Sequence, residues 1–163
     1  HLGILYAGRV VVAAQAEGAG RVRLSVAVGS AVPPLQAASG RVLLAALDAA
    51  SRDRLLTEDA EWRDMGDRAH ATLRRRLETI RERGYEEARG ESVAGVSDLS
   101  VPVGPPGLRT QAALAVTALP RDHVAWVAAT LPILRRTAAT ICAAAGLRGL
   151  GAAADEETRG NGA

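Results

Sequence analysis

The chain has 163 residues, 48% of them hydrophobic, and a formal net charge of +2, which suits one globular domain and leaves no room for two. The chain contains arginine but no lysine, and acidic residues lie among the arginines. The positive net charge is therefore no evidence for nucleic-acid binding. The single cysteine, Cys142, excludes a disulfide framework and favours a cytoplasmic location. No apolar run reaches the roughly 18 residues that a membrane-spanning helix needs, so we expect no membrane contact.

The first part of the chain has the pattern of an antiparallel sheet. Residues 2–7 and 9–15 are apolar stretches on either side of Ala7 and Gly8, which is typical of a β-hairpin. A glycine-rich turn leads into residues 21–28, where apolar side chains alternate with arginine, serine and alanine. We therefore predict a meander of three strands joined by short turns.

A proline corner follows this third predicted strand. Pro33 and Pro34 lack amide donors and fix φ, so the chain leaves the sheet there and the next predicted element is a helix. Its first turn, residues 37–40, contains only alanine, serine and glycine. Such small side chains would expose the free N–H groups of a helix start to an anion, or would let the helix pack tightly on the sheet. The sequence leaves both interpretations open.

Charged helices are predicted in the middle of the chain. Residues 51–62 indicate one or two short surface helices, and residues 67–83 form an amphipathic pattern that Gly84 should end as a C-cap. The run of arginines at 74–76 could bind phosphate. Because Glu78 and Glu82 lie within one turn of it, a solvated helix face is the better interpretation.

A second hairpin is predicted from residues 93–103 and 110–118, joined by the turn at 104–107. In its first strand the side chains at 97, 99, 101 and 103 share one face, and those at 96, 98 and 100 share the other. Asp98 should therefore point to the face that the helices do not cover. Taken alone, the pattern favours an ordinary exposed carboxylate.

The last predicted element is a long helix over residues 121–146. Apolar or small residues recur in alternating steps of three and four, a heptad seam that could pack on the chain's own sheet or pair with another subunit. Pro132 should kink the helix, and Cys142 is expected to be a small buried hydrophobe. The heptad seam of this helix consists of Val124, Val127, Leu131, Leu134, Ala138, Ile141 and Ala145.

Residues 149–163 lack apolar anchors, so we predict a disordered tail after a folded domain at 1–148.

Several motifs in this order resemble the C-terminal effector-binding domain of IclR-type bacterial transcriptional regulators over residues 2–147. They are GS-x-x-P followed by S-G-R-x-L-L-A, and R-G-Y followed by G-E, G-V and P-V. The resemblance implies an α/β (α+β) domain with a GAF-like fold, in which helices flank a central antiparallel β-sheet and a long helix comes last. In full-length members a winged helix-turn-helix precedes this domain, and nothing in this chain could be that element. We therefore expect DNA contact only through that missing N-terminal domain.

The resemblance also implies a site for a small organic acid, whose carboxylate is held by backbone amides in the small-residue turn. Apolar walls and polar strand positions would surround the rest of the ligand. Ala88 and Ala115 cannot supply the side-chain hydrogen bonds that some relatives use, whereas Asp98 adds a negative charge. We therefore predict a ligand that combines a carboxylate with a hydroxyl or amine donor facing Asp98. The implied site consists of Leu24, Val32, Ala38, Ser39, Gly40, Ala88, Val96, Asp98, Ala115 and Thr117.

Two other classes of function remain as alternatives. A hydrolytic enzyme needs a base beside its nucleophile, but His1, His70 and His123 are scattered, and no motif places any of them near Ser39 or Asp98. The same scatter is against a zinc site, so we expect no catalytic residues, metal or cofactor. An oligomerisation module without a ligand is the other alternative. The preferred interpretation is a cytoplasmic ligand-sensing domain that forms a dimer or tetramer.

Overall fold

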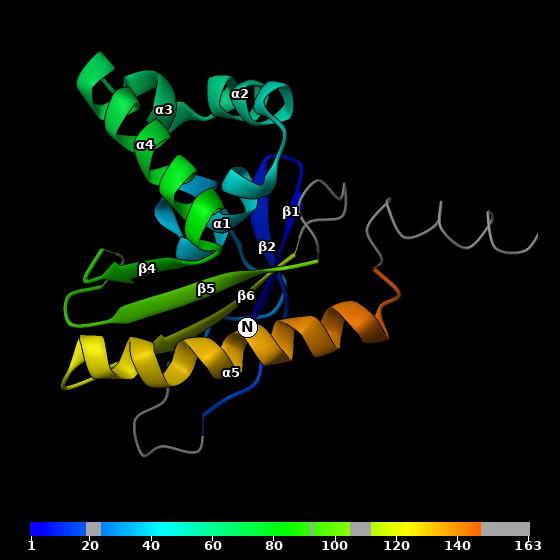
Figure 1. The fold of residues 1–163 in the computed structure, drawn as a ribbon. Helices are drawn as coiled ribbons and strands as arrows, with labels where there is room; N and C mark the ends of the chain where they lie inside the picture. The colour runs from blue at the N-terminus through cyan, green and yellow to red at the C-terminus, as the bar shows by residue number, and fades with distance from the viewer. Residues whose placement is uncertain (19–23, 92, 105–111, 148–163) are drawn as a thin grey trace, which may run out of the picture.

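The computed structural model describes residues 1–18, 24–91, 93–104 and 112–147. In this part of the chain a six-stranded antiparallel sheet has the order β3-β2-β1-β6-β5-β4 (Figure 1). Helices cover both of its faces, so the predicted α+β fold with a central antiparallel sheet is confirmed. The strands are β1 (Leu2–Tyr6), β2 (Arg9–Ala14), β3 (Ala31–Val32), β4 (Glu86–Arg89), β5 (Ser97–Val103) and β6 (Ala112–Ala118).

The predicted hairpin of β1 and β2 is confirmed. Ala7 has a φ of 47° and Gly8 a φ of 73°, so both turn residues adopt the left-handed conformation of a two-residue hairpin turn. Tyr6 pairs with Arg9 at the end of the ladder. The short turn therefore fixes the register of the strands that form one side of the molecule.

The prediction of a strand over residues 21–28 is wrong for residues 24–28, and residues 19–23 lie outside the described part of the chain. The amide of Val26 donates to Oε1 of Gln15 at 2.7 Å, and Nε2 of Gln15 donates to Oγ of Ser25 at 2.8 Å. A side chain thus takes hydrogen bonds that a neighbouring strand would otherwise make. The third strand is only the two-residue β3, beyond Gly29.

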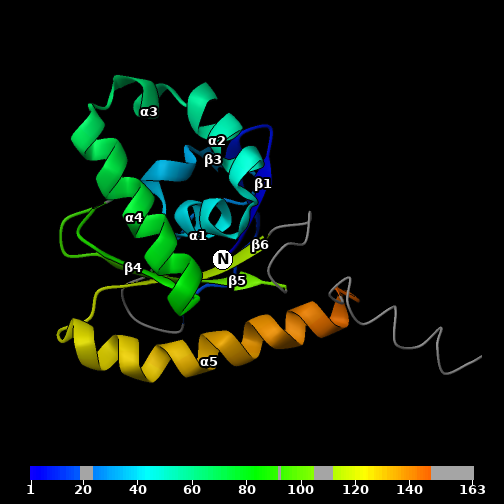
Figure 2. The ribbon, with the colours of Figure 1, turned by 45° about the horizontal axis from the view of Figure 1, so that its top comes forward.

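The helical predictions for the middle of the chain are confirmed. After the proline corner come a 3-10 turn, η1, and then α1 on one face of the sheet, with α4 packed across it (Figures 1 and 2). Gly84 ends α4 in the left-handed conformation, with a φ of 73°, as its predicted role as C-cap requires. These elements are η1 (Pro34–Gln36), α1 (Ala38–Ala46), α2 (Ala49–Glu58), α3 (Ala60–Asp64) and α4 (Asp67–Arg83).

Strand β4 at the sheet edge was not predicted from the sequence. Its sequence, Glu-Glu-Ala-Arg, shows no apolar alternation, because the side chain of Glu86 is buried among arginines instead of hydrophobic residues. The second hairpin is confirmed as β5 and β6, although β5 begins at Ser97, four residues later than predicted. The predicted turn at 104–107 lies mostly outside the described residues.

Helix α5 (His123–Ala144) lies along the other face of the sheet (Figures 1 and 2). Leu134 and Ala138 are buried against Leu99 and other residues of β5. The heptad seam thus packs mainly on the chain's own sheet, whereas Val124 at its start is 76% exposed. The predicted tail at 149–163 lies outside the described residues, within which no helix has the length and apolarity to cross a membrane.

Candidate ligand-binding site

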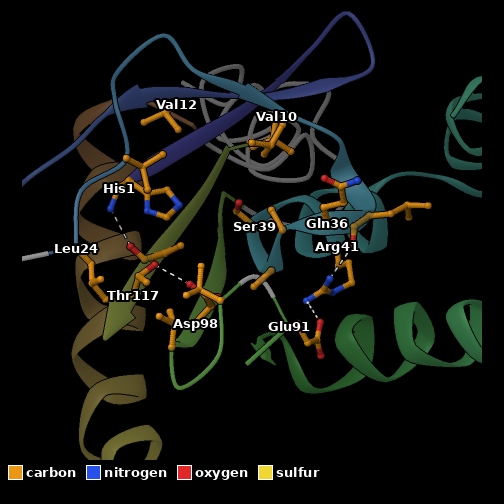
Figure 3. Close-up of a pocket in the computed structure, with 18 of the residues that line it drawn as sticks. His1, Val10, Val12, Leu24, Gln36, Ser39, Arg41, Glu91, Asp98 and Thr117 are labelled. Carbon is orange, nitrogen blue, oxygen red and sulfur yellow. Dashed lines mark hydrogen bonds and ion pairs between the residues drawn. The ribbon is translucent and has the colours of Figure 1, made fainter. Parts of the chain in front are cut away.

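A cavity of about 620 Å³ lies between the start of α1 and the sheet face that α1 covers (Figure 3). Val10 and Val12 of β2 form one apolar wall. Leu24 and Val93 also line the cavity and are 37% and 61% exposed, so solvent reaches it beside them. The volume is within the range of small-molecule sites in proteins.

Most positions of the site implied by the sequence gather around this cavity. Two do not: Gly40 and Ala88 are buried beside it and are not part of its lining. The register explains the second case, because Ala88 pairs with Asp98 across β4 and β5 and lies one strand further from the cavity. The eight positions that line it are Leu24, Val32, Ala38, Ser39, Val96, Asp98, Ala115 and Thr117.

Asp98 lies on the floor of the cavity and accepts a 2.7 Å hydrogen bond from Oγ1 of Thr117, its partner in the β5–β6 ladder. The expectation that Asp98 faces away from the helices is wrong. Alternation along β5 places Leu99 under α5, and it therefore places Asp98 on the face that α1 covers. The carboxylate is half-buried and lies across the cavity from Ser39 (Figure 3).

The start of α1 forms the opposite wall. Its first helical hydrogen bond runs from the amide of Arg41 to the carbonyl of Ala37, and no side chain caps the helix. The amides of residues 38–40 therefore precede the helical ladder. Ala38 and Ser39 line the cavity, which favours the anion-binding interpretation of this turn.

Gly40 instead supports the packing interpretation of the same turn. A Cβ atom on Gly40 would lie 2.1 Å from the carbonyl oxygen of Pro34, so only glycine lets α1 approach η1 this closely. The packing interpretation therefore holds for Gly40, and the anion-binding interpretation concerns Ala38 and Ser39 alone. Ala38 and Ser39 lie at the cavity, and Gly40 holds the helix against the proline corner.

Glu86 on β4 is buried at the edge of the sheet, and no sequence pattern predicted its burial. Its side chain is fully buried, and its Oε1 accepts hydrogen bonds from Nε of Arg41 at 2.9 Å and Nε of Arg76 at 2.6 Å. Its Oε2 accepts from Nη2 of Arg83 at 3.0 Å. Because a buried charge is costly unless it is paired, this carboxylate depends on the guanidinium groups of α1 and α4.

The ion pairs continue from Glu86 to the cavity wall. Arg41 is 3% exposed and lines the cavity together with Glu91, whose Oε2 lies 2.8 Å from Nη2 of Arg41. Glu91 also accepts from Arg76 at 2.7 Å. Burial opposes the charge of Arg76, but Glu91 and Glu86 outweigh burial and raise the pKa of Arg76. The S-G-R and G-E motifs contain Arg41 and Glu91, and they were the sequence signal for this wall.

The three histidines fall in three different environments. His1 lines the cavity, so a histidine does lie near Ser39 and Asp98, which no sequence motif indicated. His70 stacks on Trp62 with a ring separation of 3.9 Å, and His123 contacts Oγ of Ser97 at 3.0 Å.

Residues 1–144 match the family described as bacterial transcriptional regulator IclR C-terminal. A transcriptional regulator from Rhodococcus sp. RHA1 is 25% identical, with a TM-score of 0.74 over 86% of this chain and 59% of that one. An IclR transcriptional regulator from Alicyclobacillus acidocaldarius is 28% identical, with a TM-score of 0.72 over 87% of this chain and 60% of that one. An IclR homolog from Microbacterium hydrocarbonoxydans, solved with 4-hydroxybenzoate, is 23% identical. Its TM-score is 0.67 over 84% of this chain and 56% of that one.

A comparison with curated proteins gives no match. The chain spans 59% and 60% of the lengths of the first two regulators. The family match extends from β1 to the end of α5 and so includes every described strand and helix of the domain. The resemblance drawn from the sequence motifs is confirmed: the chain belongs to the IclR-type bacterial transcriptional regulators and carries their C-terminal domain.

Proposed function

We propose that this domain senses a small organic acid in the cavity between α1 and the sheet. The observation that carries the proposal is the uncapped start of α1, where Ala38 and Ser39 face a partly open cavity with mostly apolar walls. A carboxylate there would accept hydrogen bonds from the free amides and interact favourably with the helix dipole. The bound 4-hydroxybenzoate of the Microbacterium relative supports this class of ligand.

The same proposal assigns a partner to each remaining part of the ligand. Leu24, Val32 and Val96 would contact its apolar body. Asp98, held by Thr117, would accept a hydrogen bond from a hydroxyl or amine. Gly40 and Ala88 act only through packing, whereas Ala115 provides space on the cavity floor.

In the cell, ligand binding would be coupled to DNA binding. We infer that a DNA-binding domain precedes this one in the full protein, that the protein is cytoplasmic, and that chains associate as dimers or tetramers. A ligand that binds one arrangement of subunits more tightly shifts the population towards it, and with it the spacing of the DNA-binding domains. The isolated domain would then show no sequence-specific affinity for DNA.

Calorimetric titration with 4-hydroxybenzoate and related acids tests ligand sensing. In denaturation experiments, a specific ligand at a hundred times its dissociation constant should also raise the free energy of unfolding by about 2.7 kcal/mol. Ala38→Leu places a large side chain in the cavity wall and should abolish binding, whereas Ala128→Leu on the exposed side of α5 should not. If no organic acid binds, the alternative of an oligomerisation module without a ligand is supported.

The geometry does not favour a hydrolytic enzyme. His123 lies between Oγ of Ser97 and the carboxylate of Glu87, at 3.0 Å and 3.4 Å, in an order like that of a catalytic triad. Ser97, however, is 1% exposed and is not part of the cavity lining. A substrate would not reach this hydroxyl, so we interpret the contacts as packing between β5 and the start of α5.

A further inference from the structure

The ion pair between Arg41 and Glu91 forms part of the cavity wall (Figure 3). We propose that Arg41 is a second anion subsite of the cavity, that Glu91 occupies it when no ligand is bound, and that the effector is a dicarboxylic acid whose second carboxylate replaces Glu91. The inference rests on the proposed function, because it names the class of acid that the same cavity takes. It gives a role to a buried arginine to which the proposed function assigns no ligand contact.

The position of Arg41 does not depend on Glu91. Its Nε donates to Glu86 at 2.9 Å and its Nη1 donates to the carbonyl of Leu35 at 2.7 Å, and both partners are buried. These two bonds fix the plane of the guanidinium group. When Glu91 moves away, the third nitrogen, Nη2, stays where a ligand can meet it.

The contact at this third nitrogen is the weakest of the three. Nη2 of Arg41 lies 2.8 Å from Oε2 of Glu91, yet it is buried and makes no hydrogen bond of acceptable geometry. A buried donor without a hydrogen bond is costly, so an oxygen that met its N–H groups at the right angle would be preferred over Glu91. A ligand carboxylate is free to adopt that angle, whereas Glu91 is tethered to the main chain.

Glu91 can leave Arg41 without losing all of its partners. Its side chain is 38% exposed, and its Oε1 accepts a 2.7 Å hydrogen bond from Nη2 of Arg76. After the exchange Glu91 keeps Arg76 and water, and Arg41 keeps Glu86 and gains the ligand. Neither charge is left buried and unpaired, which is the condition that makes such exchanges costly.

The local charge explains why the incoming group should be anionic. Three guanidinium groups, from Arg41, Arg76 and Arg83, surround the single buried carboxylate of Glu86. Glu91 adds negative charge on the cavity side of this cluster. When Glu91 turns to Arg76, Arg41 is left with only the shared carboxylate of Glu86 as a negative partner. A neutral group beside Nη2 would not replace the charge that Arg41 loses, whereas a carboxylate would.

Matched ligands test the subsite. Dicarboxylates from succinate to suberate, and terephthalate, are titrated calorimetrically in parallel with their monomethyl esters, which have nearly the same shape but one charge fewer. The wild-type domain should bind at least one dicarboxylate about tenfold more tightly than its half-ester, as expected for a gained contact between a carboxylate and a buried arginine.

A variant of Glu91, which competes with the ligand for Arg41, makes the test sharper. Glu91→Gln removes the charge that competes with the ligand for Nη2 of Arg41, so it should tighten the dicarboxylate about fivefold and change the half-ester less than about twofold. Glu87→Gln is the matched control, since Glu87 pairs with Arg83 at 3.4 Å in the same cluster but does not line the cavity. It should leave both affinities unchanged.

The outcomes separate this inference from the proposed function. Equal binding of dicarboxylates and half-esters by the wild type would overturn the subsite while leaving acid sensing intact. An equal effect of Glu91→Gln on the affinities of both ligands would also overturn the subsite and leave acid sensing intact. If no acid of either kind binds the wild type, both proposals fail. The wild-type comparison decides the question even if the variant does not fold.

Discussion

Gly40 belongs to the proposed site by sequence and to the packing of the domain by structure. Replacing it with alanine would place a Cβ atom 2.1 Å from the Pro34 carbonyl oxygen and 2.6 Å from its Cα, both of them backbone atoms. We expect Gly40→Ala to lower the free energy of unfolding by about 3 kcal/mol. Urea denaturation measures this loss. Gly18→Ala is the control, because a Cβ there meets nothing within 4 Å; equal losses in the two variants would contradict the argument.

Asp98 should discriminate between acids that differ only in a donor. Asp98→Ala is expected to weaken 4-hydroxybenzoate by about 1–3 kcal/mol, the usual contribution of a hydrogen bond to a charged group. Benzoate should lose far less affinity in the variant, because it has no hydroxyl to donate to Asp98. Titration of both ligands against wild type and variant measures the difference. Equal losses would show that Asp98 supports the fold or the general field of the cavity and makes no specific contact.

At the scale of single residues, the family resemblance located more of the cavity than did the sequence pattern itself. The side-chain pattern alone favoured an exposed Asp98, and it became a site residue only through the register of the resemblance. Arg41 and Glu91 were visible as motif letters without a role. Their role depends on β4, which brings Glu86 under α1, and a strand of charged residues carries no hydrophobic signal.

Among the elements, α5 offers a direct test of which side packs on the sheet. Leu134 is 4% exposed and the preceding Ile133 is 56% exposed. Leu134→Ala should reduce the free energy of unfolding by about 2–5 kcal/mol, because it leaves a cavity against β5. Ile133→Ala should cost less than about 1 kcal/mol. Chemical denaturation of the two variants compares them, and similar losses would mean that α5 lies in another orientation.

Elements were predictable where their own residues stabilise them. Helix α4 has its apolar stripe and its glycine C-cap within one stretch, and its predicted bounds of 67–83 agree with the structure. The third strand was wrongly predicted over residues 24–28. The alternation of side chains there is real, but the side chain of Gln15 makes the hydrogen bonds that a neighbouring strand would otherwise make. Hydrogen bonds from a distant side chain leave no trace in the local pattern.

For the whole molecule, we predict association into dimers or tetramers. Several large apolar side chains remain on the surface of the single chain, among them Tyr6 at 70%, Val124 at 76% and Ile133 at 56% exposure. Symmetric closure is the usual way in which such surface becomes buried. Light scattering at high micromolar concentration should give two or four times the mass of one chain. A stable monomer under these conditions would contradict the prediction.

The alternation along β5 assigns neighbouring residues to separate tasks. Asp98 faces the cavity, whereas Ser97 and Leu99 on either side of it face α5. A substitution at Asp98 can therefore alter ligand preference while the support for α5 stays the same, so the domain can evolve towards new ligands without re-evolving its core. A deletion of one residue in β5 would have the opposite consequence, since it would turn the cavity floor towards α5 and expose the apolar support to the ligand.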